Sequence, residues 1–224
     1  MTAETDVPTV SHRAAGAAAP VAAAPPAPPA PALPAGNPAL LALITFLPSA
    51  LTLGLWFIGY LDTARLPGGM IATLALSAGL FMLVATVWAG RIGASTVAAI
   101  FGVFSAFWLS FALLVTALTS TWWAIAAGGV QRVQATYLLS FFCVFTLLTL
   151  ATLRLPLAFT VGFVLVDLTF LLAFIAVVNG NRDWFTWAGV TTFAFCAVFA
   201  YVLFDGFGQD LGGRAMPLGK PVIR

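Results

Sequence analysis

The sequence predicts an all-α integral membrane protein with six transmembrane helices and both termini in the cytoplasm. The first observation is composition: 62% of the 224 residues are hydrophobic and 7% are charged, whereas a soluble domain typically has about 25% charged residues. The second is the length of the apolar segments. No charged residue occurs between Ala39 and Leu61, and about 20 such residues suffice for a helix to cross a bilayer. The chain is therefore predicted to lie in a membrane.

Six apolar runs follow one another, separated by short connections. Because backbone groups in lipid must be hydrogen-bonded within their own segment, runs of this length are predicted to be helices rather than strands. The fourth and fifth runs meet at Pro156, which predicts a tight helical hairpin there. The approximate bounds are Ala39–Tyr60, Gly69–Ala89, Thr96–Leu118, Val133–Leu153, Leu157–Val178 and Trp184–Phe204.

The orientation follows from the basic residues, which favour the cytoplasmic side of a membrane. With six spans, both termini and the second and fourth connections share one side. That side carries Arg13, Arg91, Arg154, Arg214, Lys220 and Arg224, whereas the other carries Arg65, Arg132 and Arg182. The excess predicts cytoplasmic termini in a multi-pass protein of the plasma (inner) membrane.

Three regions are predicted along the chain. Residues 1–36 are rich in Ala and Pro, a composition typical of extended or disordered chain, and we expect a cytoplasmic tail. Residues 37–204 form the transmembrane domain. Residues 205–224 are predicted to be a cytoplasmic C-terminal tail.

Several classes of function are disfavoured by the residues that are missing. The only histidine, His12, and the only lysine, Lys220, lie in the two tails, so a histidine-based metal site or catalytic triad is not predicted within the membrane. Cys143 and Cys196 lie inside apolar runs and are interpreted as small buried hydrophobes. No basic cluster suited to nucleic acid is present. We expect no enzyme, metal or cofactor.

Asp167 is the one carboxylate deep inside an apolar run. A charge at this depth is costly, so the side chain should face the bundle interior or water. One interpretation is a proton-binding or gating carboxylate, and the other is a neutral acid hydrogen-bonded to a Ser or Thr of a neighbouring helix. The sequence leaves both open.

Three blocks of the sequence resemble the acetate uptake transporter family, whose bacterial members include the succinate–acetate permease. Asn37-Pro38-Ala39-Leu40-Leu41-Ala42-Leu43 resembles the family's Asn-Pro-Ala-Pro-Leu-Gly-Leu signature. Ser105-Ala106-Phe107-Trp108-Leu109 resembles its Gly-Ser-Phe-Trp-Leu block, and Gly213-Arg214-Ala215-Met216-Pro217-Leu218-Gly219 resembles its C-terminal ending. The blocks occur in the family's order.

The resemblance implies a six-helix protomer that assembles as a homo-hexamer, with one path for acetate or a small dicarboxylate such as succinate in each protomer. The family's constriction residues correspond to Phe46, Phe104 and Leu168, and its asparagine after the fifth helix corresponds to Asn179. Asp167 occupies a position where the family commonly has a small hydroxyl residue.

We therefore expect a transporter or channel for acetate or another small carboxylate, with proton linkage an open question. An anion-collecting vestibule is predicted at Asn37 and Pro38, because a helix start offers unpaired N–H donors. The constriction is predicted to act as a hydrophobic gate. The alternative is a membrane sensor or partner subunit that transports nothing.

Overall fold

The computed structural model describes residues 36–61, 68–120 and 123–223, which form helices and no strand. The elements are α1 (Pro38–Phe57), the π-helix η1 (Thr73–Leu80), α2 (Phe81–Arg91), α3 (Ser95–Thr119), the 3₁₀ turn η2 (Ala127–Gly129), α4 (Val130–Thr152), α5 (Leu157–Asn179) and α6 (Arg182–Asp210). Within the described residues, six segments are long and apolar enough to cross a membrane, with η1 and α2 forming one of them. The predicted all-α fold with six spans is confirmed. The predicted tail over residues 1–36 lies outside the described residues except at its last position.

Local sequence explains where the first and last helices begin. The Asn37 side chain accepts a hydrogen bond from the Ala39 N–H at 3.0 Å, and Pro38 occupies the first helical position. At α6, the Asn181 side chain accepts from the Asp183 N–H at 2.9 Å. Asparagine favours the residue before a helix because its side chain satisfies a backbone donor that the helix leaves free.

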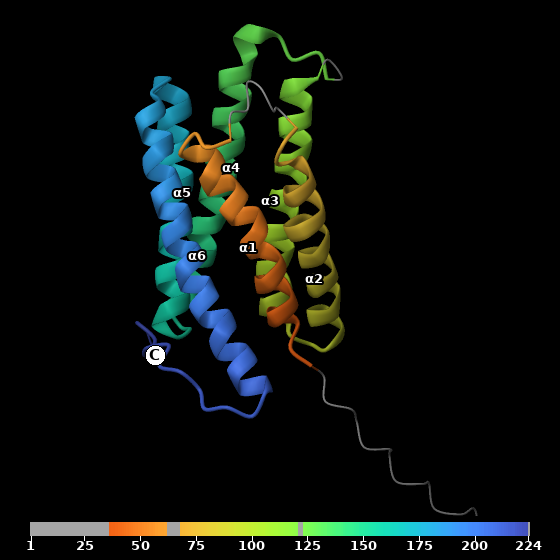
Figure 1. Ribbon diagram of the computed structural model, residues 1–224, viewed down its shortest axis with the longest axis vertical. Helices are drawn as coiled ribbons and strands as arrows, with labels where there is room; N and C mark the ends of the chain where they lie inside the picture. Colours follow the sequence, from red (N-terminus) through yellow and green to blue (C-terminus); the bar gives the residue numbers. More distant parts are fainter. Residues whose placement is uncertain (1–35, 62–67, 121–122, 224) are drawn as a thin grey trace, which may run out of the picture. The chain divides into compact units, whose positions relative to one another are not determined.

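The helices run up and down as an antiparallel bundle (Figure 1). α5 packs against both α4 and α6, and α6 packs against α1, whereas α3 packs mainly on the second span and meets α4 only lightly. The start of α1 and the C-terminal residues lie at the same end of the bundle, which we call the terminal end (Figure 1). The loose α3–α4 contact leaves room for large side chains between these two helices.

The second span is tied to its neighbours by serine hydroxyls. The Ser49 hydroxyl of α1 donates to the Thr73 carbonyl at 2.7 Å and accepts from the Ala78 N–H at 3.0 Å. The Ser105 hydroxyl of α3 donates to the Gly79 carbonyl at 2.7 Å. Because a π-helix departs from the regular i to i−4 pattern, these contacts pair backbone groups that lipid could not satisfy.

The C-terminal residues fold back onto the terminal end of the bundle. α6 continues to Asp210, beyond the predicted end of the last span at residue 204. The Asp205 carboxylate then accepts a hydrogen bond from the Met216 N–H at 2.6 Å. The Ala158 N–H at the start of α5 donates to the Leu218 carbonyl at 2.9 Å. The segment after α6 is therefore bound to the end of α6 and the start of α5.

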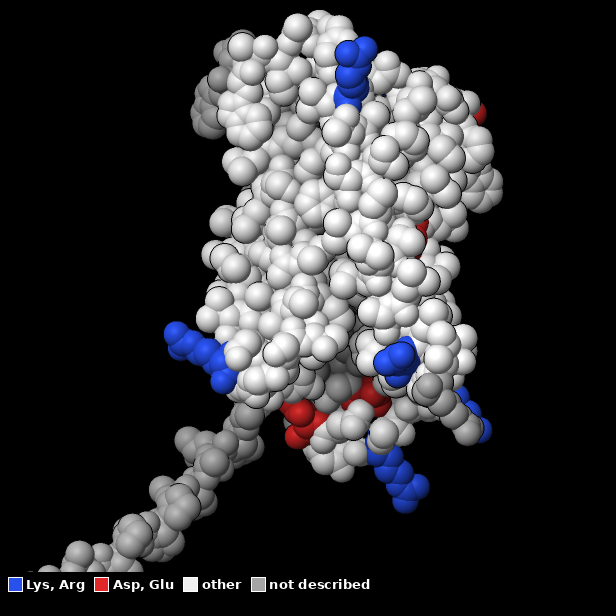
Figure 2. All heavy atoms as spheres, turned by 180° about the vertical axis from the view of Figure 1, so that it is seen from behind, with Lys and Arg blue, Asp and Glu red and all other residues white. Residues whose placement is uncertain are grey.

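Charged side chains avoid the middle of the bundle. On the face shown in Figure 2, basic side chains gather around the terminal end, and the middle is almost entirely uncharged. The described basic residues divide by position in the chain into Arg91, Arg154, Arg214 and Lys220 at the terminal end, and Arg132 and Arg182 at the other. This distribution matches the composition expected of a protein surrounded by lipid at mid-height.

Candidate functional site

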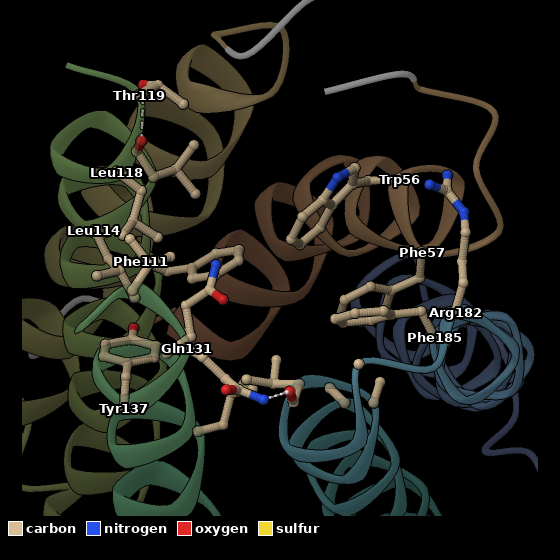
Figure 3. A pocket seen from close by; sticks show the side chains of 18 of the residues that line it. Trp56, Phe57, Phe111, Leu114, Leu118, Thr119, Gln131, Tyr137, Arg182 and Phe185 are labelled. Atoms are coloured by element: carbon tan, nitrogen blue, oxygen red, sulfur yellow. Dashed lines mark hydrogen bonds between the residues drawn. The ribbon is translucent and has the colours of Figure 1, made fainter. Parts of the chain in front are cut away.

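A cavity of about 660 Å³ enters the bundle at the end opposite the terminal end, and we call it the wide cavity. It lies between the last turns of α1, α3 and α5 and the first turns of α4 and α6. Figure 3 shows Trp56, Phe57 and Arg182 on one side of it and Leu118, Gln131 and Tyr137 on the other. Its polar lining consists of Thr119, Gln131, Gln134, Tyr137, Asn181 and Arg182.

The glutamine at the start of α4 fixes one wall of the wide cavity. The Gln131 Nε2 donates to the carbonyls of Val177 and Val178, at 2.8 and 2.9 Å. Carbonyls in the last turn of a helix have no partner within the helix, so this side chain caps α5 and binds it to α4. The Tyr137 hydroxyl donates to the Phe107 carbonyl of α3 at 2.8 Å. Together these contacts hold three helices around the cavity.

Arg182 gives the wide cavity its charge. It is the one charged residue among the described residues that line the cavity, and it is the first residue of α6. Its guanidinium forms no hydrogen bond or ion pair with the described part of the chain. The N-terminus of α6 is capped by Asn181 and followed by the acidic Asp183, so the guanidinium of Arg182 is the group in the cavity wall that favours an anion.

A second, much smaller cavity of about 30 Å³ lies deeper in the bundle, and we call it the throat. Phe57, Phe111, Leu138 and Ala173 line both cavities, so the throat opens on the floor of the wide cavity. Its volume holds about two water molecules. The remaining lining consists of Phe46, Leu53, Phe104, Phe107, Trp108, Val166, Thr169, Phe170 and Phe195.

Phe46 lies at the centre of the throat's rings. Its side chain is 2% exposed, and its ring centroid lies 5.4 Å from that of Phe104, 5.9 Å from that of Trp108 and 5.8 Å from that of Phe195. The contacts with Phe104 and Trp108 are edge-on, the geometry that aromatic pairs favour. Such a ring-lined constriction expels water and closes a path without any covalent or ionic contact.

The structure brings together two of the three residues expected at the constriction. Phe46 and Phe104 meet in the throat, but Leu168 is 39% exposed and does not line it. Consecutive helix residues point about 100° apart, so Leu168 turns outward where the adjacent Thr169 faces the throat. From α5, Phe163 instead packs against Phe104 with centroids 5.7 Å apart. The expectation that Leu168 converges with the two phenylalanines is therefore corrected.

Asp167 lies beside the throat lining without belonging to it. Its Oδ2 accepts a hydrogen bond from the Thr149 hydroxyl of α4 at 2.7 Å. Its Oδ1 is buried and has no hydrogen-bond partner among the described residues. The contact with Thr149 is the one expected of a neutral acid hydrogen-bonded to a Ser or Thr of a neighbouring helix. The unpaired Oδ1 is the atom at which a proton would bind.

The remaining predicted residues lie at helix ends. Asn37 and Pro38 are at the terminal end of α1, far along the bundle from the wide cavity, and neither lines it. The Asn37 side chain already accepts a hydrogen bond from the Ala39 N–H, one of the backbone donors that were predicted to bind an anion. Asn179 is the exposed last residue of α5, next to Gly180 and Asn181 in the cavity wall.

The polar wall of the wide cavity was not predicted from the sequence. One signal was available: Gln131, Gln134 and Tyr137 recur every three residues, which places them along one side of a helix. Arg182 was predicted only to lie on the non-cytoplasmic side of the membrane. Nothing in this wall is suited to a metal, and no group of three His, Cys, Asp or Glu side chains gathers in the described residues.

Comparison with known proteins agrees with this architecture. A sequence model of the GPR1/FUN34/yaaH family matches residues 19–210. Among solved structures, the fold is similar to that of the bacterial acetate channel SatP, with a TM-score of 0.71 and 22% sequence identity. The similarity covers 82% of this chain and 99% of that chain. Comparison with curated proteins gives no match.

Proposed function

The chain belongs to the GPR1/FUN34/yaaH family, and from this premise we propose that it conducts acetate or another small carboxylate across a membrane. The similar solved structure is that of a bacterial acetate channel, and the two folds agree with a TM-score of 0.71. The observation that carries the proposal is the arrangement of the two cavities: a wide, cationic cavity leads directly into a throat lined by aromatic rings. No catalytic activity is assigned to the chain.

The wide cavity is suited to collecting a small anion from water. Arg182 supplies positive potential at its wall, and Gln131, Gln134 and Tyr137 supply polar groups. A cavity with one sign of charge raises the local concentration of the oppositely charged solute. A carboxylate therefore concentrates at the mouth of the throat before it loses its water.

The throat acts as the gate. A space for about two water molecules is too narrow for a hydrated carboxylate. Conduction therefore requires the rings of Phe46 and Phe104 to turn aside, and the described state is closed. Because the lining is apolar, the closed throat is dry and prevents ions from leaking.

The path continues from the throat toward the terminal end, where Asn37 and Pro38 begin α1. We assign these two residues to the second mouth, and Asn179 to the rim of the first. Asp167 is assigned as the proton-binding group beside the gate, since its Oδ1 has no partner among the described residues. Neutralised by a proton, it would not repel a passing carboxylate.

The setting of the protein completes the proposal. The excess of basic residues at the terminal end supports cytoplasmic termini in the plasma membrane. The family resemblance supports a hexamer in which each protomer has its own path. The wide cavity then faces the outside of the cell.

Uptake of labelled acetate into vesicles containing the purified protein tests the proposal. We expect uptake well above that of protein-free vesicles, and inhibition by other small carboxylates. Uptake equal to that of protein-free vesicles would overturn the proposal and favour a sensor or partner subunit that transports nothing.

A further inference from the structure

The indole N–H of Trp108 is the feature of the throat that the gate does not explain. Trp108 lies on α3 and is 1% exposed. Its Nε1 is buried and has no hydrogen-bond partner among the described residues. Buried donors in native proteins are nearly always paired, so an unpaired one in the membrane interior calls for a physical reason.

The position of Trp108 supplies that reason. The residue lines the throat, where its ring packs against Phe46 and Phe107 at centroid distances of 5.9 and 4.9 Å. The exposed surface of the closed throat is apolar, so the N–H is covered in this state. The only other polar side chain among the described throat residues is that of Thr169. The Thr169 hydroxyl already contacts the Leu165 carbonyl at 2.9 Å and the Thr191 hydroxyl at 2.7 Å.

We propose that, once the rings of Phe46 and Phe104 turn aside, the Trp108 N–H donates a hydrogen bond to the carboxylate of the permeating anion inside the throat. This inference rests on the proposed function. It identifies the Trp108 N–H as the donor that replaces a hydrogen bond from water to the anion in the narrowest part of the path. An indole N–H donates and never accepts, so it favours solutes with acceptor oxygens. Because it is neutral, it holds a carboxylate without trapping it as a buried guanidinium would, and conduction requires that binding be weak enough to reverse.

The test compares Trp108→Phe with Trp187→Phe. Trp187 lies on α6 and is 60% exposed, so the second variant removes an indole outside the throat. Acetate uptake by vesicles is measured as a function of acetate concentration. For Trp108→Phe the half-saturating concentration should rise about tenfold, the size expected when one hydrogen bond to a charged group is lost. Trp187→Phe should match the wild type.

Two further measurements separate hydrogen bonding from a change in width. Glycerol permeation reports the width of the throat, and it should not fall in Trp108→Phe. The midpoint of thermal unfolding in detergent should rise with sodium acetate for the wild type and much less for Trp108→Phe. If this variant does not fold, 3-benzothienylalanine at position 108, which keeps the shape and lacks the N–H, takes its place.

The outcomes distinguish the two proposals. Wild-type uptake with an unchanged half-saturating concentration in Trp108→Phe would overturn the role of Trp108 and leave the proposed function intact. No uptake by the wild type would overturn the proposed function. If the wild type shows no uptake and its unfolding midpoint also does not rise with acetate, both proposals are overturned.

Discussion

The wide cavity and the throat are adjacent but opposite in character. The wide cavity measures about 660 Å³ and presents an arginine, two glutamines and a tyrosine, whereas the throat measures about 30 Å³ and presents aromatic rings. Four residues line both. In the proposed function, capturing an anion and removing its water therefore belong to different parts of one bundle.

The position of each cavity in the membrane explains the difference. The wide cavity is built from the ends of helices, where free backbone groups and polar side chains reach water. The throat lies deeper in the bundle and is built mainly from α1, α3, α5 and α6, with Leu138 of α4, where lipid surrounds the bundle and polar groups are costly. Substitutions in the throat should therefore change the rate and selectivity of transport, whereas substitutions in the wide cavity should change the capture of the anion.

The largest effect is expected from Phe46→Ala, which removes the central ring of the throat. Deleting a buried phenylalanine side chain costs about 3–5 kcal/mol of stability, and the space that it leaves should let water and larger carboxylates through. We expect severalfold faster acetate uptake and the loss of discrimination against larger carboxylates, measured in vesicles. A thermal unfolding scan measures the loss of stability.

Phe204→Ala is the matched control, because Phe204 lies on α6 with 70% of its side chain exposed. This variant should transport like the wild type. A Phe46→Ala protein that folds and retains the wild-type rate and selectivity would remove Phe46 from the gate.

The second effect concerns the charge of the wide cavity. Arg182→Gln removes the positive charge from the wall, so acetate uptake at low ionic strength should fall roughly threefold. Salt screens the attraction in the wild type, and the difference should therefore shrink at high ionic strength. Arg132→Gln is the control, since Arg132 belongs to α4 at the same end and does not line the cavity. Equal loss in both variants would contradict a specific role of Arg182.

A smaller effect is expected from Asp167→Asn, which keeps the shape of the side chain and removes its charge. If the neutral form permits conduction, wild-type uptake should decline as the pH rises and Asp167 ionises. The variant should then be nearly independent of pH between mildly acidic and mildly alkaline conditions, where acetate is ionised throughout. Parallel pH profiles would restrict Asp167 to its structural contact with Thr149.

The sequence predicted the helices more accurately than the site. Lipid requires long apolar helices, so composition alone placed the six spans within a few residues, although polar Asp205 and Gln209 concealed the extension of α6. Phe46 and Phe104 followed from the family resemblance. Leu168 was placed wrongly because α5 is apolar on every side, so its sequence carries no stripe that identifies the inner face.

The wide cavity could not be located from the sequence because helix ends on both sides of the membrane look alike. Asn37 caps the start of α1 and Asn181 caps the start of α6 in the same way, yet only Asn181 lines the cavity. The wide cavity is lined by α3 and α4, which pack loosely against each other, and such packing is a tertiary property. Trp108 was hidden for a similar reason, since an unpaired donor is visible only when its neighbours are known.

The most direct test of a path through each protomer uses Ala173, which lines both cavities. Ala173→Cys is made in a chain in which Cys143 and Cys196 are alanine, and is treated with an anionic methanethiosulfonate reagent while acetate uptake is measured. The account predicts that modification reduces uptake to the level of protein-free vesicles and that acetate slows the modification. If mass spectrometry shows that the protein is fully modified and acetate uptake is unchanged, a path through each protomer is contradicted.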